Sequence, residues 1–288
     1  MRSLAHQEKV SLGTIQGQLL QACKSLPHNA DLTREFGKRY SGILLVDGKF
    51  IKVKSYQRKI PCIYGIDYLT HDIVHFVLAP SENYQAALSF FRSLRLTGYP
   101  LKTLVCDDNL SFRLAVTKVY PKTIVQLCQN HYKENIRRDL RTLNIDPKVS
   151  TFMVDIENLF SHRRSREEFA FVARRIIARH PNQEYLKWLI DMEQKQNLLL
   201  AYNQDKKIPH TTNLIECFNS HLQGRLKTIK CFEKLSTAKL WLNAYFIYRR
   251  LKPFTDCAGR FKHLNGYCSL QMVVENQSQF IKLKQKLR

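Results

Sequence analysis

The spacing of apolar residues changes near residue 42 from a helical to an extended pattern. Before that point Leu12, Ile15 and Leu19 recur at helical intervals. We therefore expect a short helical segment over residues 1–40. Its outline is that of a partial helix-turn-helix, with a small helical support for the next domain as the alternative.

Residues 41–131 carry short apolar runs that predict strands, followed by strands alternating with amphipathic helices. Three runs come first and predict an antiparallel meander. A helix, a strand, a second helix and a last strand follow, and Gly98 and Pro121 end the two helices. The expected elements span 43–53, 61–67, 73–78, 83–96, 101–106, 110–119 and 123–127. Their order is typical of an α/β fold with a ribonuclease-H-like mixed sheet and helices on its faces.

Helical patterns without strands fill the next stretch of the chain. Residues 132–207 predict an all-helical insertion, whose clearest pair of helices is separated at Pro181. Residues 208–252 return to the core with two amphipathic helices, and the first of them carries Glu216. Residues 253–288 are expected to form a basic C-terminal tail. The basic residues near its end are Lys282, Lys284, Lys286 and Arg288.

The charge balance indicates the class of partner. The chain has 46 Lys and Arg against 24 Asp and Glu, a formal net charge of +22, and 44% of its 288 residues are hydrophobic. A core can therefore form, and the positive charge favours nucleic acid or an anionic membrane surface. No apolar run approaches the roughly 20 residues of a spanning helix, and the N-terminus lacks the apolar stretch of a signal peptide. We expect a cytoplasmic, nucleic-acid-binding protein that does not span a membrane.

Arginines are dense in the predicted insertion. Nine of them fall within residues 137–179. A charge run is ordinarily a solvated helix face, but at this net charge we expect a surface that binds backbone phosphates. The residues assigned to DNA binding are Arg137, Arg138, Arg163, Arg164, Arg174, Arg175, Arg225 and Lys227.

Two aspartates lie on or directly after apolar strands. Asp47 lies in the first strand and Asp107 follows the fourth, and neighbouring central strands can bring the two carboxylates together. Burying an unpaired charge is expensive, and coordination of a cation resolves that cost. Clustered carboxylates are the oxygen ligands that Mg²⁺ prefers. Asp108 is an alternative to Asp107, a hairpin turn at Asp47-Gly48 is the alternative for Asp47, and Asp67 near a second turn is left out of the site.

Glu216 is the candidate for a third carboxylate. At about 100° per residue, it shares the polar face of its helix with Asn213 and Ser220, whose side chains can orient it. The alternative is an ordinary surface glutamate. With Asp47 and Asp107 it completes a site for two Mg²⁺ or Mn²⁺ ions. Such ions activate the attacking oxygen and stabilise the leaving oxygen in phosphodiester displacement.

Four motifs, taken in order, resemble the DDE transposases of the Mutator-like superfamily, which includes bacterial mutator-type insertion-sequence enzymes. The similarity covers roughly residues 40–270, and the third and fourth motifs are fairly specific to that group. The motifs are Leu45-Val46-Asp47-Gly48, Leu104-Val105-Cys106-Asp107, Cys128-Gln129-Asn130-His131 and Thr211-Thr212-Asn213-Leu214-Ile215-Glu216.

The resemblance implies a ribonuclease-H-like catalytic domain whose three carboxylates form the catalytic triad and hold divalent metal. Cys128 and His131 match the Cys-x-x-His pair of these enzymes. A closed structural zinc site needs four ligands, and the sequence near this pair offers no second one. We therefore assign Cys128, His131 and Asn213 a supporting role, in structure or in positioning DNA.

The resemblance also implies an activity and its partners. Such a transposase cuts DNA at the ends of its element and joins them to target DNA. The expected partners are double-stranded DNA, at element ends and target, and a second copy of the chain in a homodimer on paired ends, at the nucleoid of a prokaryotic host. These enzymes usually carry a larger N-terminal DNA-binding region, so we expect that region to be reduced or the chain to be a fragment. The alternatives are an inactive or domesticated DNA-binding relative and a ribonuclease-H-like nuclease without strand transfer.

Overall fold

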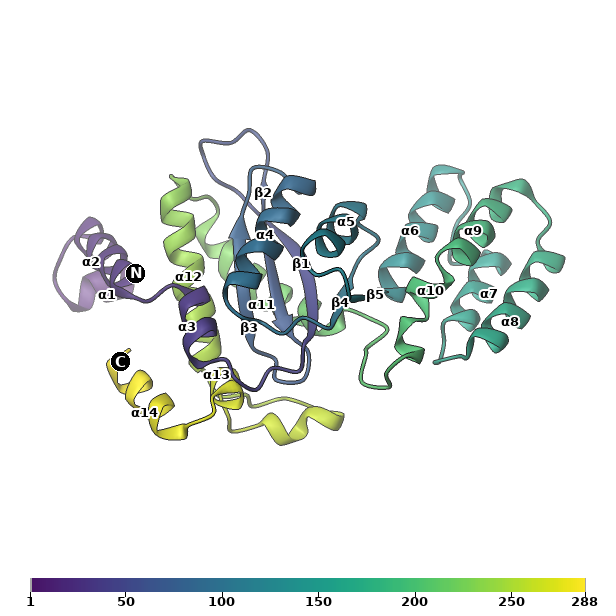
Figure 1. Cartoon of the computed structure of the whole chain (residues 1–288). Coiled ribbons are helices and arrows are strands. Elements are labelled where there is room, and N and C mark those ends of the chain that lie inside the picture. The colour runs from purple at the N-terminus through teal and green to yellow at the C-terminus, as the bar shows by residue number, and fades with distance from the viewer. Residues whose placement is uncertain (1, 288) are drawn as a thin grey trace.

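A five-stranded mixed sheet forms the centre of the protein (Figure 1). The computed structural model describes residues 2–287, and Arg288 of the expected basic tail lies outside them. The strand order is β3-β2-β1-β4-β5, with the first three strands antiparallel and β1, β4 and β5 parallel. The mixed α/β class is confirmed. The strands are β1 (Ile43–Ile51), β2 (Ile60–Asp67), β3 (Ile73–Leu78), β4 (Thr103–Cys106) and β5 (Ile124–Leu127).

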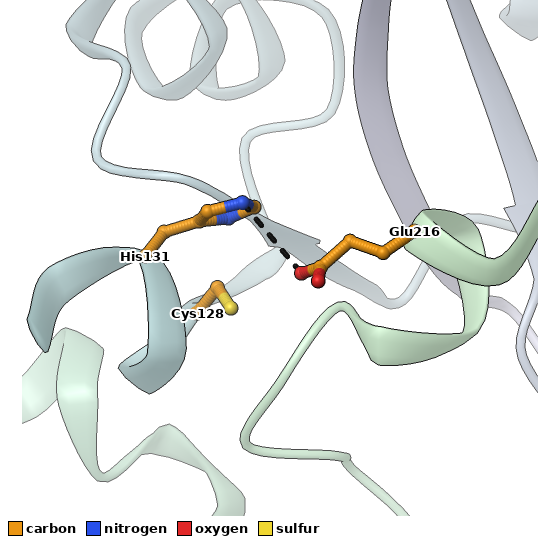
Figure 2. A group of neighbouring side chains, drawn as sticks. All are labelled: Cys128, His131 and Glu216. Carbon is orange, nitrogen blue, oxygen red and sulfur yellow. Dashed lines mark ion pairs between the residues drawn. The ribbon is translucent and has the colours of Figure 1, made fainter. Parts of the chain in front are cut away.

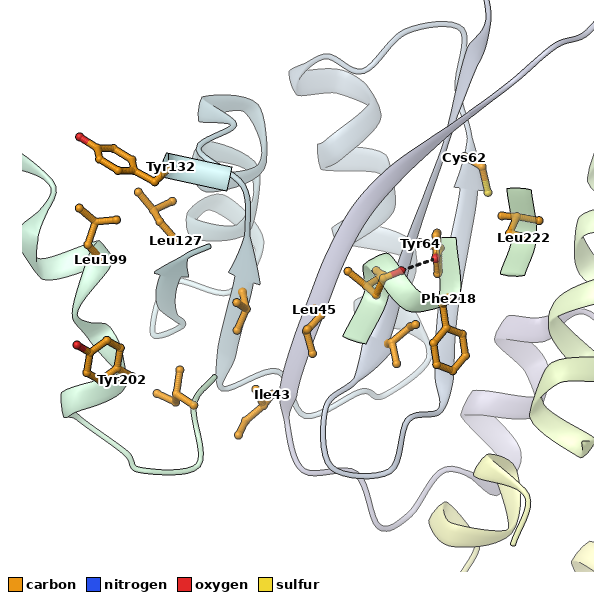
Figure 3. Close-up of a cluster of buried hydrophobic side chains, with 14 of the residues drawn as sticks. Ile43, Leu45, Cys62, Tyr64, Leu127, Tyr132, Leu199, Tyr202, Phe218 and Leu222 are labelled. Atoms are coloured by element: carbon orange, nitrogen blue, oxygen red, sulfur yellow. Dashed lines mark hydrogen bonds between the residues drawn. The ribbon is translucent and has the colours of Figure 1, made fainter. Parts of the chain in front are cut away.

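Both faces of the sheet are covered by helices, which explains why its strands are almost continuously apolar. Leu44 and Val46 of β1 point to one face, where α4 (Tyr84–Leu96) and α5 (Leu110–Val119) pack. Leu45 points to the other face, beneath α11 (Asn213–Ile229) and α12 (Leu235–Leu251). Figure 3 shows Phe218 and Leu222 of α11 beside the strands on that second face.

Between β5 and α11 the described chain forms helices only, set to one side of the sheet (Figure 1). The first helix begins at Gln129, three residues before the predicted start of the insertion, because β5 ends at Leu127 and Cys128 serves as N-cap. The elements are α6 (Gln129–Thr142), α7 (Thr151–Leu159), α8 (Arg166–Arg179), α9 (Gln183–Gln194), α10 (Gln196–Leu199) and the 3₁₀ turn η1 (Ala201–Asn203).

A buried glutamine ties these helices to the sheet. The Gln126 side-chain amide donates to the Leu199 carbonyl at 2.9 Å, and its oxygen accepts from the Tyr202 backbone N–H at 2.8 Å. Gln129 donates to the same Leu199 carbonyl at 3.0 Å. Since buried polar groups are costly when unpaired, these bonds fix the return of the chain towards α11 against β5.

The two terminal segments pack together on α12. The N-terminal helices are α1 (Arg2–Gln7), α2 (Leu12–Ser25) and α3 (Asn29–Phe36), and the C-terminal elements are η2 (Gly259–Leu264), α13 (Ser269–Val273) and α14 (Gln277–Lys286). Leu32, Ile247, Leu270 and Phe280 share one buried cluster. The segment from 253 onwards, which was expected as a basic tail, contains helices that pack in this cluster. Within residues 2–287, no helix has the length and apolarity needed to cross a bilayer.

Helix α3 supports the sheet. Its Asn29 side chain donates to the Ile73 and Val74 carbonyls of β3, and the Thr33 hydroxyl also donates to Val74. Both side chains are buried. These contacts favour the helical-support alternative for the first forty residues.

Asp67 has a structural role at the end of β2. It is buried, and its carboxylate accepts hydrogen bonds from the Ser41, Thr70 and Tyr99 hydroxyls at 2.7–2.9 Å. Because the side chains around it supply these donors, Asp67 needs no cation.

His71, in the turn between β2 and β3, is expected to make stability depend on pH. Its ring is 5% exposed, packs on Phe254 and Phe261, and has a buried Nε2 without a hydrogen-bond partner. Burial, aided by the charges of His263 and Arg260, lowers the pKa of His71 to about 4. The folded state thus favours neutral imidazole. The stabilisation is complete above the unfolded pKa near 6.5 and is lost as the pH falls towards 4.

Replacing His71 by Asn, which tolerates the left-handed φ of 55° found there, removes this dependence. Between pH 7.5 and pH 5 the wild type is expected to lose about 2 kcal/mol more of its free energy of unfolding than His71→Asn. Urea unfolding at both pH values measures the difference, with His162→Asn, at an exposed position, as control. Equal pH dependence in the wild type and His71→Asn would contradict the assignment.

Candidate active site

The two predicted aspartates lie on neighbouring strands, Asp47 in the middle of β1 and Asp107 directly after β4. The parallel register pairs Leu45 with Val105, and two residues further along the chain Asp47 and Asp107, which follows β4, are close enough for their charges to interact. Side chains two residues apart point to the same face of a sheet. Since Leu45 and Val105 belong to the core beneath α11, both aspartates point towards that helix.

Neither aspartate is neutralised by Lys or Arg within residues 2–287. Asp47 accepts from the Gly48 backbone N–H at 2.8 Å, whereas Asp107 Oδ1 is buried without a hydrogen-bond partner. Burial raises the pKa of Asp107, and the charge of Asp47 raises it further. Burial also raises the pKa of Asp47, against the opposing hydrogen bond from Gly48. No Lys or Arg thus offsets the charge of the pair, and the nearby positive group that opposes the rise of both pKa values is His131.

Asp108 differs from its neighbour because it is already paired. Arg113 Nη2 lies 3.0 Å from one of its carboxylate oxygens and Lys195 Nζ lies 2.5 Å from the other. Lys195 follows α9, so this contact joins the helical segment to the strand end. Of the two alternatives left open by spacing, Asp107 is the carboxylate without a cation partner.

A fourth carboxylate, missed by the sequence analysis, joins this pair. Glu82 lies in the loop between β3 and α4, and its carboxylate packs against Gly48, where a Cβ would overlap Glu82 Oε1. Burial and the charges of Asp107 and Asp47 raise the pKa of Glu82 to about 7. An acidic residue just before a helix is usually explained by its favourable interaction with the positive end of the helix dipole. The sequence therefore gave no reason to assign Glu82 to the site.

Glu216 lies in the first turn of α11, with its carboxylate directed towards α6 (Figure 2). Its Oε1 accepts from the Thr212 hydroxyl at 2.9 Å and lies 3.6 Å from His131 Nε2. The Glu216 charge is among the causes that raise the pKa of Asp47. The three predicted carboxylates thus share one region above β1 and β4.

Cys128 and His131 stand opposite Glu216 rather than apart from the site. Cys128 Sγ accepts from the backbone N–H and the hydroxyl of Thr212 at 3.3 and 3.1 Å. The hydrogen bond between His131 and Cys128 raises the pKa of His131 to about 9, although burial opposes the shift. Burial raises the pKa of Cys128, but the hydrogen bond and charge of His131 outweigh it and lower the pKa overall. Each of the two groups therefore stabilises the charged form of the other.

Residues 26–246 match the family model described as "Transposase, Mutator family". The chain belongs to the Mutator family of transposases. The match covers more than half of the sequence and includes every carboxylate described above. No curated protein matches the chain.

In this transposase, α11 supplies a second side chain that the sequence analysis missed. Asn219 donates to Asp47 Oδ2 at 2.5 Å and accepts from the Tyr64 hydroxyl at 3.0 Å. It lies three residues after Glu216 and so faces the same side of the helix. Asn213, for which the sequence predicted a supporting role, accepts a hydrogen bond from the Asn130 side chain of α6 at 2.8 Å.

The arginines assigned to DNA binding in the transposase differ in what they already contact. Arg163 donates three hydrogen bonds to carbonyls between residues 202 and 208 and stacks on the Tyr202 ring, and Arg164 donates two to carbonyls at the end of α7. Arg137 pairs with Glu134 and Glu157. Those that are exposed and form no ion pair within residues 2–287 are Arg138, Arg174, Arg175, Arg225 and Lys227.

The excess positive charge of the transposase is concentrated after the helical segment. Residues 132–207 contain 15 Lys and Arg against 11 Asp and Glu, so most of their charge is internally balanced. Residues 208–288 contain 14 against 4. A polyanion is therefore attracted more strongly by the part of the chain that begins with α11 than by the helical segment before it.

Proposed function

We propose that this transposase cuts DNA at the ends of its element and joins the freed 3′-hydroxyl to target DNA, using a ribonuclease-H-like domain. Asp47, Asp107 and Glu216 would hold two divalent ions, Mg²⁺ or Mn²⁺. The observation that carries the proposal is the convergence of these carboxylates on the sheet face beneath α11, where Asp47 and Asp107 have no Lys or Arg partner within residues 2–287 and one buried oxygen of Asp107 has no hydrogen-bond partner. Hard oxygen donors of this kind fit Mg²⁺.

The protein's own residues prepare the site for such ions. The Tyr64–Asn219 hydrogen-bond chain fixes one oxygen of Asp47, and the Gly48 backbone N–H fixes the other. The Thr212 hydroxyl holds one oxygen of Glu216, on the side of His131. When bound, the ions activate the attacking oxygen and stabilise the leaving oxygen of the phosphodiester.

Contacts to DNA backbone phosphates are proposed for the exposed basic residues. A groove of about 130 Å³ at the far end of α11 is lined by Lys52, Lys59, Lys227 and Lys230. Arg225 is exposed on the same helix. Phosphate binding by such side chains is sensitive to salt and independent of sequence. A homodimer on paired ends, acting at the nucleoid, remains a proposal that rests on the family.

The test is an assay with DNA that carries the ends flanking the element. Cleavage and joined products in Mg²⁺ or Mn²⁺, absent in EDTA, are the expected result. Cleavage without joined products would select the nuclease. DNA binding without cleavage in either metal, with both ends supplied, would select the inactive DNA-binding relative.

Glu82 is proposed as a further carboxylate of the metal site. We expect Glu82→Gln to lower cleavage at fixed Mg²⁺ about 10–100-fold, as loss of an outer-shell partner does. Part of the activity should return as Mg²⁺ is raised, because the substitution weakens metal binding and leaves the fold intact. Titration of cleavage against Mg²⁺ measures this, with Glu35→Gln, at an exposed position of α3, as control. An unchanged Mg²⁺ requirement in Glu82→Gln would exclude the role.

A further inference from the structure

Three donor atoms of different chemistry converge between α6 and α11 (Figure 2). One ligand atom each of Cys128, His131 and Glu216 lies within 4.8 Å of the other two. Bond lengths of a tetrahedral zinc site place its ligand atoms about 3.4–3.6 Å apart. The 3.6 Å between His131 Nε2 and Glu216 Oε1 already has that length. The remaining edges need to close by about 1 Å at most.

The three donors lie in, or directly next to, regular secondary structure, Cys128 being the one residue between β5 and α6. Cys128 is 1% exposed, and its backbone N–H bonds the Cys106 carbonyl at 2.8 Å. His131 follows three residues later, in the first turn of α6, and Glu216 lies in the first turn of α11. The Gln129 N–H bonds the His210 carbonyl at 2.9 Å, which joins the two helix starts. The donors are therefore pre-organised rather than carried on loops.

A single buried hydroxyl touches all three donors. Thr212 Oγ1 lies 3.1 Å from Cys128 Sγ, 2.9 Å from Glu216 Oε1 and 3.3 Å from His131 Nδ1. Its one hydrogen can serve either the sulfur or the carboxylate, but not both. A cation between these two acceptors satisfies both. A contact from Nδ1 to Thr212 leaves Nε2, the nitrogen nearest Glu216, free to coordinate, as the outer partners of ligating histidines do.

We propose that Cys128, His131 and Glu216 form a Zn²⁺ site distinct from the carboxylate site. Thiolate and imidazole donors favour Zn²⁺, whereas Mg²⁺ prefers oxygen donors and is not expected here. Three protein ligands with an open fourth position are typical of an accessible zinc site rather than a closed structural one. The pair that looked too small for zinc in the sequence gains its third ligand from α11.

The two sites share Glu216, and this consequence rests on the proposed function. A carboxylate held by Zn²⁺ beside Cys128 and His131 is withdrawn from the ions at Asp47 and Asp107. Zn²⁺ therefore inhibits Mg²⁺-dependent cleavage, and a chelator selective for Zn²⁺ restores it.

Binding is tested on the full chain with Zn²⁺ competed against a chromogenic chelator, and with Co²⁺, whose thiolate charge-transfer absorption reports ligation by Cys128. One Zn²⁺ per chain is expected. Cys128→Ser and His131→Ala each remove a ligand and should weaken Zn²⁺ binding more than about 100-fold, the largest effect expected for an outer-shell change. Thr212→Val removes an outer-shell partner and should weaken Zn²⁺ binding about 10–100-fold. Cys217→Ser, at the exposed cysteine next to Glu216, is the matched control and should bind as the wild type does.

The outcomes separate this inference from the proposed function. Asp107→Asn should bind Zn²⁺ normally, so the binding result is decisive even if the protein cuts no DNA. The site would be overturned if the wild type bound no Zn²⁺, or if His131→Ala bound Zn²⁺ as well as the wild type. His131 is the better test position because its side chain is only half-buried, so its loss is less of a risk to folding than the loss of Cys128. Zn²⁺ bound without any loss of cleavage by the active wild type would overturn the sharing of Glu216.

Discussion

Asp107→Asn is expected to lower DNA cleavage at least about 100-fold, more than the loss of an outer-shell partner of a metal site. The substitution keeps the shape of the side chain and removes the charge that would bind metal. Asp107 has no Lys or Arg partner within residues 2–287, so its carboxylate is free for that purpose. The loss should appear in cleavage while DNA binding, which depends on basic residues, stays close to that of the wild type.

The adjacent Asp108 gives the matched control. Asp108→Asn removes ion pairs with Arg113 and Lys195, so it should lower the melting temperature. Its cleavage rate should stay within about tenfold of the wild-type rate, which corresponds to about 1.36 kcal/mol of activation free energy. Both variants are compared by circular dichroism and by cleavage of the same DNA. An active Asp107→Asn beside a folded, inactive Asp108→Asn would show that the second carboxylate is Asp108.

Arg250→Met is expected to cost about 3–5 kcal/mol of the free energy of unfolding, because it leaves a buried charge without its partner. Arg250 and Asp72 are both 0% exposed, and two guanidinium nitrogens donate to the two carboxylate oxygens at 3.0 and 2.7 Å. The same guanidinium also bonds Asn29, Thr33 and Tyr40. One side chain thus joins α12 to α3 and to the turn before β3.

The neighbouring arginine provides the control for this prediction. Arg249 is half-buried, makes no ion pair within residues 2–287 and stacks on the Phe218 ring. Arg249→Met should therefore lower the free energy of unfolding by about 1 kcal/mol, the contribution of that contact. Urea unfolding measures both variants. The double variant Arg250→Met with Asp72→Asn should lose less stability than the two single changes summed, since the unpaired charge is gone. A strictly additive loss would mean that the ion pair itself contributes nothing.

The pattern of apolar and polar residues predicted the elements and the order in which they carry the candidate site residues. Apolar runs in a sheet buried on both faces leave few positions for a charged residue, so Asp47 and the aspartates after β4 stood out. Helical periodicity located α11 and its acidic residue. These features depend on neighbours within a few residues along the chain, which is why pattern alone revealed them.

Tertiary structure decided which side chains meet. Register across β1 and β4 placed Asp107 against Asp47, and long-range ion pairs distinguished it from Asp108. Glu82, which approaches Gly48 from a distant loop, and the meeting of α11 with Cys128 and His131 had no marker in the sequence. Such contacts join residues many positions apart, and the chain's pattern records the burial of a residue but not the identity of its partner.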